Sequence, residues 1–228
     1  MGNPRYLAFA ALAAGPLLGM SPLLGASSAL AGVCVTASVS VYEAAGFSCS
    51  VGPVTFSNIA VLPTVSGSGV VTLNDFSPFS VVVDGTPEYG LHLFYASDTG
   101  TTPGSQADVG WTYDVSGVPK LTDAYAVYAG TMTGTGATDL SEVLSNGVSL
   151  SLTAPGAISA MFSPIGSLNV IKDQNDFAGS AGSADSSILG NAFSVVPEAS
   201  TWAMMLAGFA GLGFLGWRGS RNTTARAA

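Results

Sequence analysis

Short stretches in which apolar and polar residues alternate recur through the middle of the chain, and they constrain the fold more than any other feature. Every second residue is apolar in 109–115, and the same pattern returns in 148–153. This period of two places the apolar side chains on one face of a β-strand. Asn146-Gly147 separates 140–144 from 148–152, and both residues tolerate the positive φ of a tight turn. The sequence therefore predicts a hairpin at this place.

Turn-rich segments bound further apolar stretches of strand length. The chain has 29 Gly and only 9% charged residues, so it is poor in Lys, Glu and Arg, the residues that usually form the exposed faces of helices in a bundle. About ten short strands without a fixed repeat predict an all-β chain with a single β-sandwich, of jelly-roll or immunoglobulin-like type. The further predicted strands are 54–59, 69–73, 79–83, 91–95, 125–132, 158–162 and 168–171.

The N-terminus has the pattern of a secretory signal peptide. Arg5 precedes an apolar, small-residue run over 6–24, and Ala29-Leu30-Ala31 supplies small residues for a signal peptidase. We expect cleavage after Ala31. The alternative is an uncleaved anchor, which Pro16 disfavours because proline breaks a spanning helix.

A second apolar run lies near the C-terminus. Residues 202–217 carry no charge and would form a helix of about 24 Å. Trp202 and Trp217 bound the run as in an interfacial aromatic belt, and Arg218 and Arg221 follow it. These features predict a transmembrane helix with the tail in the cytoplasm, rather than the alternative of a buried core helix.

Charge excludes one class of partner. The chain has 6 Lys+Arg against 14 Asp+Glu, a net charge of −8, and only Lys120 and Lys172 are basic between the two apolar runs. Such a surface repels nucleic acid, so we expect no nucleic-acid binding.

Residues 196–208, followed by a Gly-rich apolar run and arginines, resemble the PEP-CTERM sorting signal, whose usual form is Val-Pro-Glu-Pro-Ser-Thr-Trp-Ala. Ala199 stands where the second proline usually lies. The resemblance implies recognition and cleavage by an exosortase, a membrane protease that looks like a cysteine transpeptidase. It also implies release from the inner membrane to the cell surface or the exopolysaccharide matrix. By the same resemblance, recognition is carried by Pro197, Glu198, Ala199, Ser200, Thr201 and Trp202.

These predictions divide the chain into three parts. We expect a signal peptide at 1–31, a β-sandwich ectodomain at 32–196 and a sorting signal at 197–228. The last part comprises the motif at 197–201, the helix at 202–217 and the basic tail at 218–228.

Two cysteines remain after signal removal. Cys34 and Cys49 would lie in an oxidising compartment, so we expect a disulfide rather than a metal site. The segment 46–58 also resembles a Cys-x-x-Gly-x-x-x-Phe-Ser-Asn element of some PEP-CTERM ectodomains, a resemblance that implies no activity.

The sequence offers little support for catalysis. His92 is the one histidine, lies in a predicted strand, and no Gly-x-Ser-x-Gly motif accompanies it. Asp173, Asn175 and Asp176 could supply calcium ligands, but Phe177 interrupts the loop pattern, so a solvated turn is the simpler reading. We expect no catalytic residue, metal or cofactor. Two alternatives stay open: a glycan-binding module or adhesin of the biofilm matrix, and a secreted hydrolase.

Overall fold

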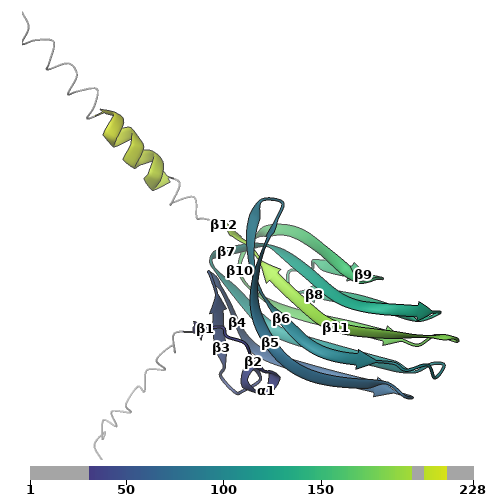
Figure 1. Ribbon diagram of the computed structural model, residues 1–228. Helices are drawn as coiled ribbons and strands as arrows, with labels where there is room; N and C mark the ends of the chain where they lie inside the picture. Colours follow the sequence, from purple (N-terminus) through teal and green to yellow (C-terminus); the bar gives the residue numbers. More distant parts are fainter. Residues whose placement is uncertain (1–30, 197–202, 215–228) are drawn as a thin grey trace, which may run out of the picture. The chain divides into compact units, whose positions relative to one another are not determined.

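Residues 31–196 and 203–214 are described by the computed structural model (Figure 1). Within 31–196 the chain forms one short helix, α1 (Val39–Tyr42), and otherwise strands. The strands are β1 (Gly32–Val33), β2 (Ala37–Ser38), β3 (Ser48–Val51), β4 (Val54–Ser66), β5 (Val70–Val83), β6 (Thr86–Asp98), β7 (Gln106–Gly134), β8 (Ala137–Leu144), β9 (Ser149–Leu152), β10 (Gly156–Phe177), β11 (Gly182–Phe193) and β12 (Val195–Val196).

These strands confirm the all-β prediction, but hydrogen bonds join them into one continuous sheet rather than the two separate sheets expected of a sandwich. The main path runs β1-β3-β4-β7-β11-β6-β5-β2, and β10, β12, β8 and β9 branch from it through β7. Figure 1 shows the long strands curling together, so that one face of the sheet becomes concave. The contacts described below fill this concave face.

The strand β7 makes the branching possible, because it changes partners along its 29 residues. Its first part, up to Gly117, pairs with β4 and β10. Its later part, from Tyr125, pairs with β11 on one side and still with β10 on the other. The predicted strands 109–115 and 125–132 are therefore one strand.

The same merging occurs in two other places. The predicted strands 69–73 and 79–83 both lie in β5, and 158–162 and 168–171 both lie in β10. Register shifts interrupt both long strands, between Leu73 and Phe76 in β5 and between Met161 and Ser167 in β10. Such bulges bend a strand without ending its pairing, which is why the intervening polar residues did not terminate it.

The core forms where the curled sheet folds over itself. The four alternating apolar residues of 109–115 share one face of β7, as predicted, and all four are buried. Phe76 on β5 lies 5.2 Å from Trp111 on β7, and Phe56 on β4 lies 6.3 Å from Phe193 on β11, measured between ring centroids. Neither pair joins hydrogen-bonded neighbours, so these aromatic contacts hold the two halves of the concave face together.

The predicted hairpin is confirmed, with a different turn. β8 and β9 pair antiparallel, with Leu140 opposite Leu152. The backbone N–H of Leu144 donates to the carbonyl of Val148 at 2.9 Å, which leaves three residues in the loop. Gly147 has φ +89°, whereas Asn146 keeps a negative φ and its side chain accepts a hydrogen bond from the Val148 N–H. A three-residue loop needs only one left-handed residue.

Candidate functional site

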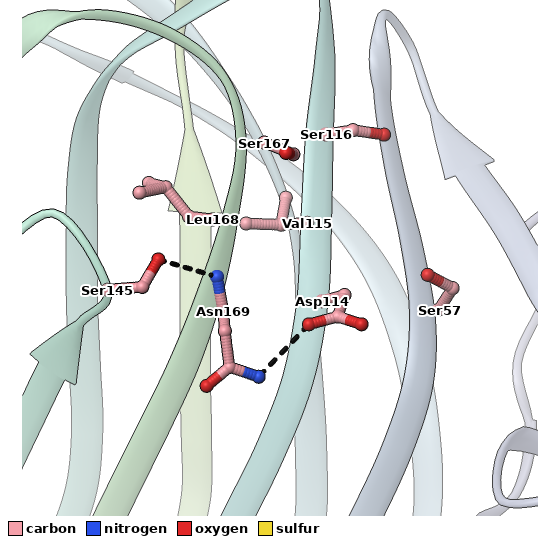
Figure 2. A pocket seen from close by; sticks show the side chains of 8 residues that line it. All are labelled: Ser57, Asp114, Val115, Ser116, Ser145, Ser167, Leu168 and Asn169. Carbon is pink, nitrogen blue, oxygen red and sulfur yellow. Dashed lines mark hydrogen bonds between the residues drawn. The ribbon is translucent and has the colours of Figure 1, made fainter.

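A polar groove lies on the outer face of the sheet, where β4, β7 and β10 run side by side next to the β8–β9 turn (Figure 2). Its volume is about 420 Å³. The buried residues Val115 and Leu168 complete a lining that is otherwise polar. The polar lining residues are Ser57, Asp114, Ser116, Ser145, Ser167 and Asn169. We call this site the outer groove.

Asp114 is held in the outer groove from both sides. The Asn58 Nδ2 donates to its Oδ2 at 2.7 Å, and the Asn169 Nδ2 donates to its Oδ1 at 3.0 Å. These two hydrogen bonds, the one from Asn58 first, lower the pKa of Asp114 below its ordinary value. The carboxylate is therefore ionised at neutral pH and fixed in orientation.

The local backbone explains why Asn58 reaches Asp114. A register shift between Ser57 and Ala60 interrupts the pairing of β4 with β7, and Asn58 sits within it at φ +52°. Asparagine tolerates this left-handed conformation better than most residues. The bulge turns the Asn58 side chain across to the neighbouring strand.

Asn169 is fixed on the opposite side of the groove. Its backbone N–H donates to the Ser145 Oγ at 3.0 Å, and its carbonyl accepts from the Ser145 N–H at 2.9 Å. Figure 2 shows Asn169 bonded to Ser145 on one side and to Asp114 on the other. The β8–β9 turn and β10 are thereby coupled at the edge of the groove.

A second cluster of polar residues lies in the interior, on the concave face of the sheet. The Lys172 Nζ lies 2.8 Å from the Glu142 Oε2 and donates to the Gly190 carbonyl at 2.6 Å. Burial lowers the pKa of Lys172, and the Glu142 carboxylate opposes that shift. Further along β10, the Tyr95 hydroxyl donates to the Gln174 Oε1 at 2.9 Å. This interior network could not be predicted from the sequence, since an alternating strand gives no sign that a lysine faces inward.

His92 is a packed residue. Its ring stacks on Phe79 with 3.7 Å between centroids and 7° between planes, and Phe94 meets it edge-on. Burial and then the Lys172 charge lower its pKa. No bonded carboxylate orients this imidazole among the interactions of the described residues, so its surroundings are those of a structural aromatic.

The residues considered for calcium do not converge. Asp173, Asn175 and Asp176 lie within the long strand β10, not in a turn. Asp176 faces the interior and accepts hydrogen bonds from Gln174 and Ser186 at 2.7 and 2.8 Å, while Asp173 is exposed on the opposite face. In the described ranges, no group of three or more His, Cys, Asp or Glu side chains is arranged to hold a metal ion.

The predicted disulfide is present. Cys34 and Cys49 are bonded, with 4.8 Å between their Cα atoms and both side chains buried. The bond joins the segment after β1 to β3, which also pair in parallel through Gly32 and Cys49. The disulfide therefore fixes the first strand, β1, to its neighbour β3.

The folded part of the chain continues up to the predicted sorting signal. Phe193 and Ser194 are buried, and the Ser194 N–H donates to the Asp123 Oδ1 at 2.8 Å. Val195 and Val196 then form β12, opposite Leu121 and Lys120 of β7. No unpaired residue separates β12 from Pro197 in the sequence.

The apolar C-terminal run contains a helix over 203–214 whose residues are all exposed. Met204, Leu206, Phe209 and Leu212 are each more than 60% exposed. Among the described residues, no helix has the length and apolar character needed to cross a membrane. Residues 1–30 of the predicted signal peptide (1–31), the recognition residues 197–202, and Trp217, Arg218 and Arg221 all lie outside the described residues.

Sequence reasoning missed the outer groove. Its residues come from four separate stretches, and the polar positions of an alternating strand look alike before their neighbours are known. One signal was present: Ser57 and Asn58 end the 46–58 element singled out above.

Solved structures resemble the chain only distantly. The matches include tailspike protein 4 of bacteriophage CBA120 (TM-score 0.30, 15% identity, 59% of this chain and 19% of that one). TmCBM61, solved with β-1,4-galactotriose, has a TM-score of 0.30 and 10% identity over 59% of this chain and 88% of its own. The Clostridium thermocellum xylanase 10B CBM22-1–GH10 modules, solved with xylohexaose, have a TM-score of 0.19 and 12% identity over 56% of this chain and 25% of that one.

Curated protein sequences gave no match to the chain. A family model for the PEP-CTERM protein-sorting motif does match, over residues 195–222. The match begins at the first residue of β12 and extends through the exposed apolar helix. The chain is therefore a protein with a C-terminal PEP-CTERM protein-sorting motif.

Proposed function

We propose that the chain is an exported, non-enzymatic surface or matrix protein, held at the inner membrane by its C-terminal helix until an exosortase-type protease processes it. The match to the sorting motif at 195–222 is the observation that carries the proposal. The secretory pattern of 1–31 and the disulfide Cys34–Cys49 agree with export, because disulfides persist in oxidising compartments.

The exposed apolar helix supports membrane anchoring. A helix that is apolar on every side is normally buried in a core or in lipid. Residues 203–214 are exposed all round, and the uncharged run extends to Trp202 and Trp217. In the proposal, 202–217 forms the membrane helix, and local thinning of the bilayer accommodates its short length.

The position of β12 supports processing next to a folded domain. Since pairing with β7 ends at Val196, cleavage near Glu198 leaves every described strand intact. The released product would be the ectodomain 32–196 with a few residues of the motif.

The test follows processing of the full chain, co-expressed with an exosortase-type protease, by mass spectrometry of the membrane and released fractions. We expect Glu198→Ala to lower the released fraction and Ala199→Pro, which restores the usual form of the motif, to raise it. Thr201→Ala, inside the matched range, should also lower the released fraction. Thr223→Ala, just outside that range, is the matched control and should leave it unchanged. Released protein with an intact C-terminus would refute processing.

Anchoring is tested separately. Leu206→Arg with Phe209→Arg should move the full chain from the carbonate-resistant pellet to the supernatant, since each arginine at the centre of a membrane helix costs about 2.5–3.5 kcal/mol. Ser220→Arg, beyond the apolar run, is the control. Retention of the double variant in the pellet would place the anchor elsewhere.

A further inference from the structure

We propose that the outer groove binds a neutral, hydroxyl-rich ligand, specifically a short stretch of an uncharged polysaccharide. This inference goes beyond sorting, because the groove lies in the described β-domain and uses none of residues 195–222. It would stand or fall whether or not the C-terminus is processed.

The side chains of the groove are joined by hydrogen bonds without any ligand. Asp114 is fixed by Asn58 and Asn169, and Asn169 is fixed in turn by Ser145. These residues come from β4, β7, β10 and the β8–β9 turn, so one hydrogen-bonded frame spans the groove. A site of this kind loses little conformational entropy when a ligand binds.

The frame leaves polar groups available to a ligand. Each Asp114 oxygen accepts one hydrogen bond and can accept another. The Ser145 Oγ accepts the Asn169 N–H, so its own O–H is free to donate. The hydroxyls of Ser57, Ser116 and Ser167 make no hydrogen bond within the described residues. The groove thus presents both donors and acceptors at close spacing.

Charge decides which ligands fit. Asp114 is the one titratable residue of the lining, and it carries a negative charge at neutral pH, which its hydrogen bonds from Asn58 and Asn169 favour. Phosphate, sulfate and uronic acids would meet a fixed negative charge with no lysine or arginine beside it. A cation would find a single carboxylate, whereas Ca²⁺ takes six to eight oxygens. Neutral hydroxyls both donate to the carboxylate and accept from the serines.

Size and lining agree with a saccharide. The volume of about 420 Å³ falls in the usual range for small-ligand sites. No aromatic residue lines the groove, so ring stacking is absent and affinity for one unit should be weak. A polymer with repeated units compensates through multivalent contact when many protein copies share a surface. Glycosidases use a pair of carboxylates, so a groove with Asp114 alone is suited to binding rather than cleavage.

Saturation-transfer difference NMR tests the site on the full chain in detergent. The probes are neutral disaccharides (cellobiose, maltose, galactobiose and mannobiose) and digalacturonate as the acidic counterpart. We expect saturation transfer to at least one neutral disaccharide and none to digalacturonate. Absence of transfer to all four neutral disaccharides, or equal transfer to digalacturonate, overturns the proposal.

Variants locate the binding. Asp114→Asn should weaken binding roughly tenfold or more, because it replaces a charged acceptor and breaks the frame. Asp75→Asn removes the same charge from an exposed position on β5 and should leave binding unchanged. The double variant Ser116→Ala with Ser167→Ala keeps the frame and should still weaken binding roughly threefold or more. Wild-type affinity in both groove variants, with unchanged melting temperatures, would show that the sugar binds elsewhere and refute the site.

Discussion

Lys172 and Glu142 form an ion pair, 2.8 Å between Nζ and Oε2, with both side chains fully buried between the two halves of the curled sheet. The Lys172 ammonium also lies 5.9 Å from the centre of the Trp111 ring. Each charge is stable in the interior only because the other is present, since an isolated buried charge is costly.

Lys172→Met should therefore lower the free energy of unfolding by about 3–5 kcal/mol, because it leaves the Glu142 carboxylate buried without a partner. Urea unfolding followed by tryptophan fluorescence measures the loss. Lys120→Met, at the exposed second lysine, is the control and should change stability by less than about 0.5 kcal/mol. The double variant Lys172→Met with Glu142→Leu should recover most of the loss; a double variant as unstable as the single one would show that the pairing is not the cause.

Stability should also depend on pH through Glu88, which is 1% exposed. Burial first, then the charges of Asp123 and Asp84, raise its pKa from an ordinary 4.5 to about 8. The folded state therefore keeps the proton up to about pH 8, while the unfolded state loses it near pH 4.5. Since the unfolded state binds fewer protons in between, the Glu88 contribution to stability falls as pH rises through this window.

Comparison of wild type with Glu88→Gln isolates that contribution. Wild type should lose on the order of 2–4 kcal/mol between pH 5 and pH 8 relative to Glu88→Gln, which cannot ionise. Asp75→Asn, an exposed acidic residue of β5, should follow the wild-type pH profile. Parallel profiles for wild type and Glu88→Gln would contradict the raised pKa.

The strand alternation in the middle of the chain could be predicted from the sequence, and so could the shared face of the four apolar residues of 109–115. The lengths of the strands were not. β7 and β10 continue through Pro119 and Pro164 because they exchange neighbours or shift register there, and pairing partners are not visible in a single sequence. The hairpin position could be predicted from Asn146-Gly147, but the extra loop residue depends on the Leu144–Val148 hydrogen bond.

The sorting motif and the outer groove also differ in how far the sequence alone could predict them. The sorting motif is contiguous, so its residues were readable directly, as was the pairing of the two cysteines. The outer groove is assembled from distant residues: Asn58 and Asp114 are 56 positions apart, and their contact depends on the bulge in β4. The inward position of Lys172 could not be predicted, because the inward face of β10 is set by its pairing with β7 and β8.

Removal of the disulfide should lower the free energy of unfolding by about 3 kcal/mol on the chain-entropy estimate for a loop of this length. The double variant Cys34→Ser with Cys49→Ser avoids a free thiol, and chemical unfolding without reductant gives the difference from wild type. Wild type treated with reductant under denaturing conditions and refolded should match the variant. Equal stability of wild type and variant in oxidising buffer would contradict this prediction.

Gly90 should tolerate no larger residue. A Cβ at this position would lie 2.0 Å from the carbonyl oxygen of Asn191 and 2.7 Å from the Cα of Ala192, both backbone atoms of β11. Gly90→Ala should therefore cost at least about 1–3 kcal/mol, seen as a lower melting temperature. At Gly166, where a Cβ would meet nothing within 4 Å, the same change should have little effect. Similar melting temperatures for the two variants would show that β6 and β11 are more loosely joined than described.

The strand β7 bonds to β4, β10, β11 and β12, so its backbone belongs to both walls of the concave face. There is consequently no seam along which one wall could detach while the other stays folded. The β-domain should lose its structure in one cooperative step, and a protease in the surrounding medium would find few partly opened molecules to attack.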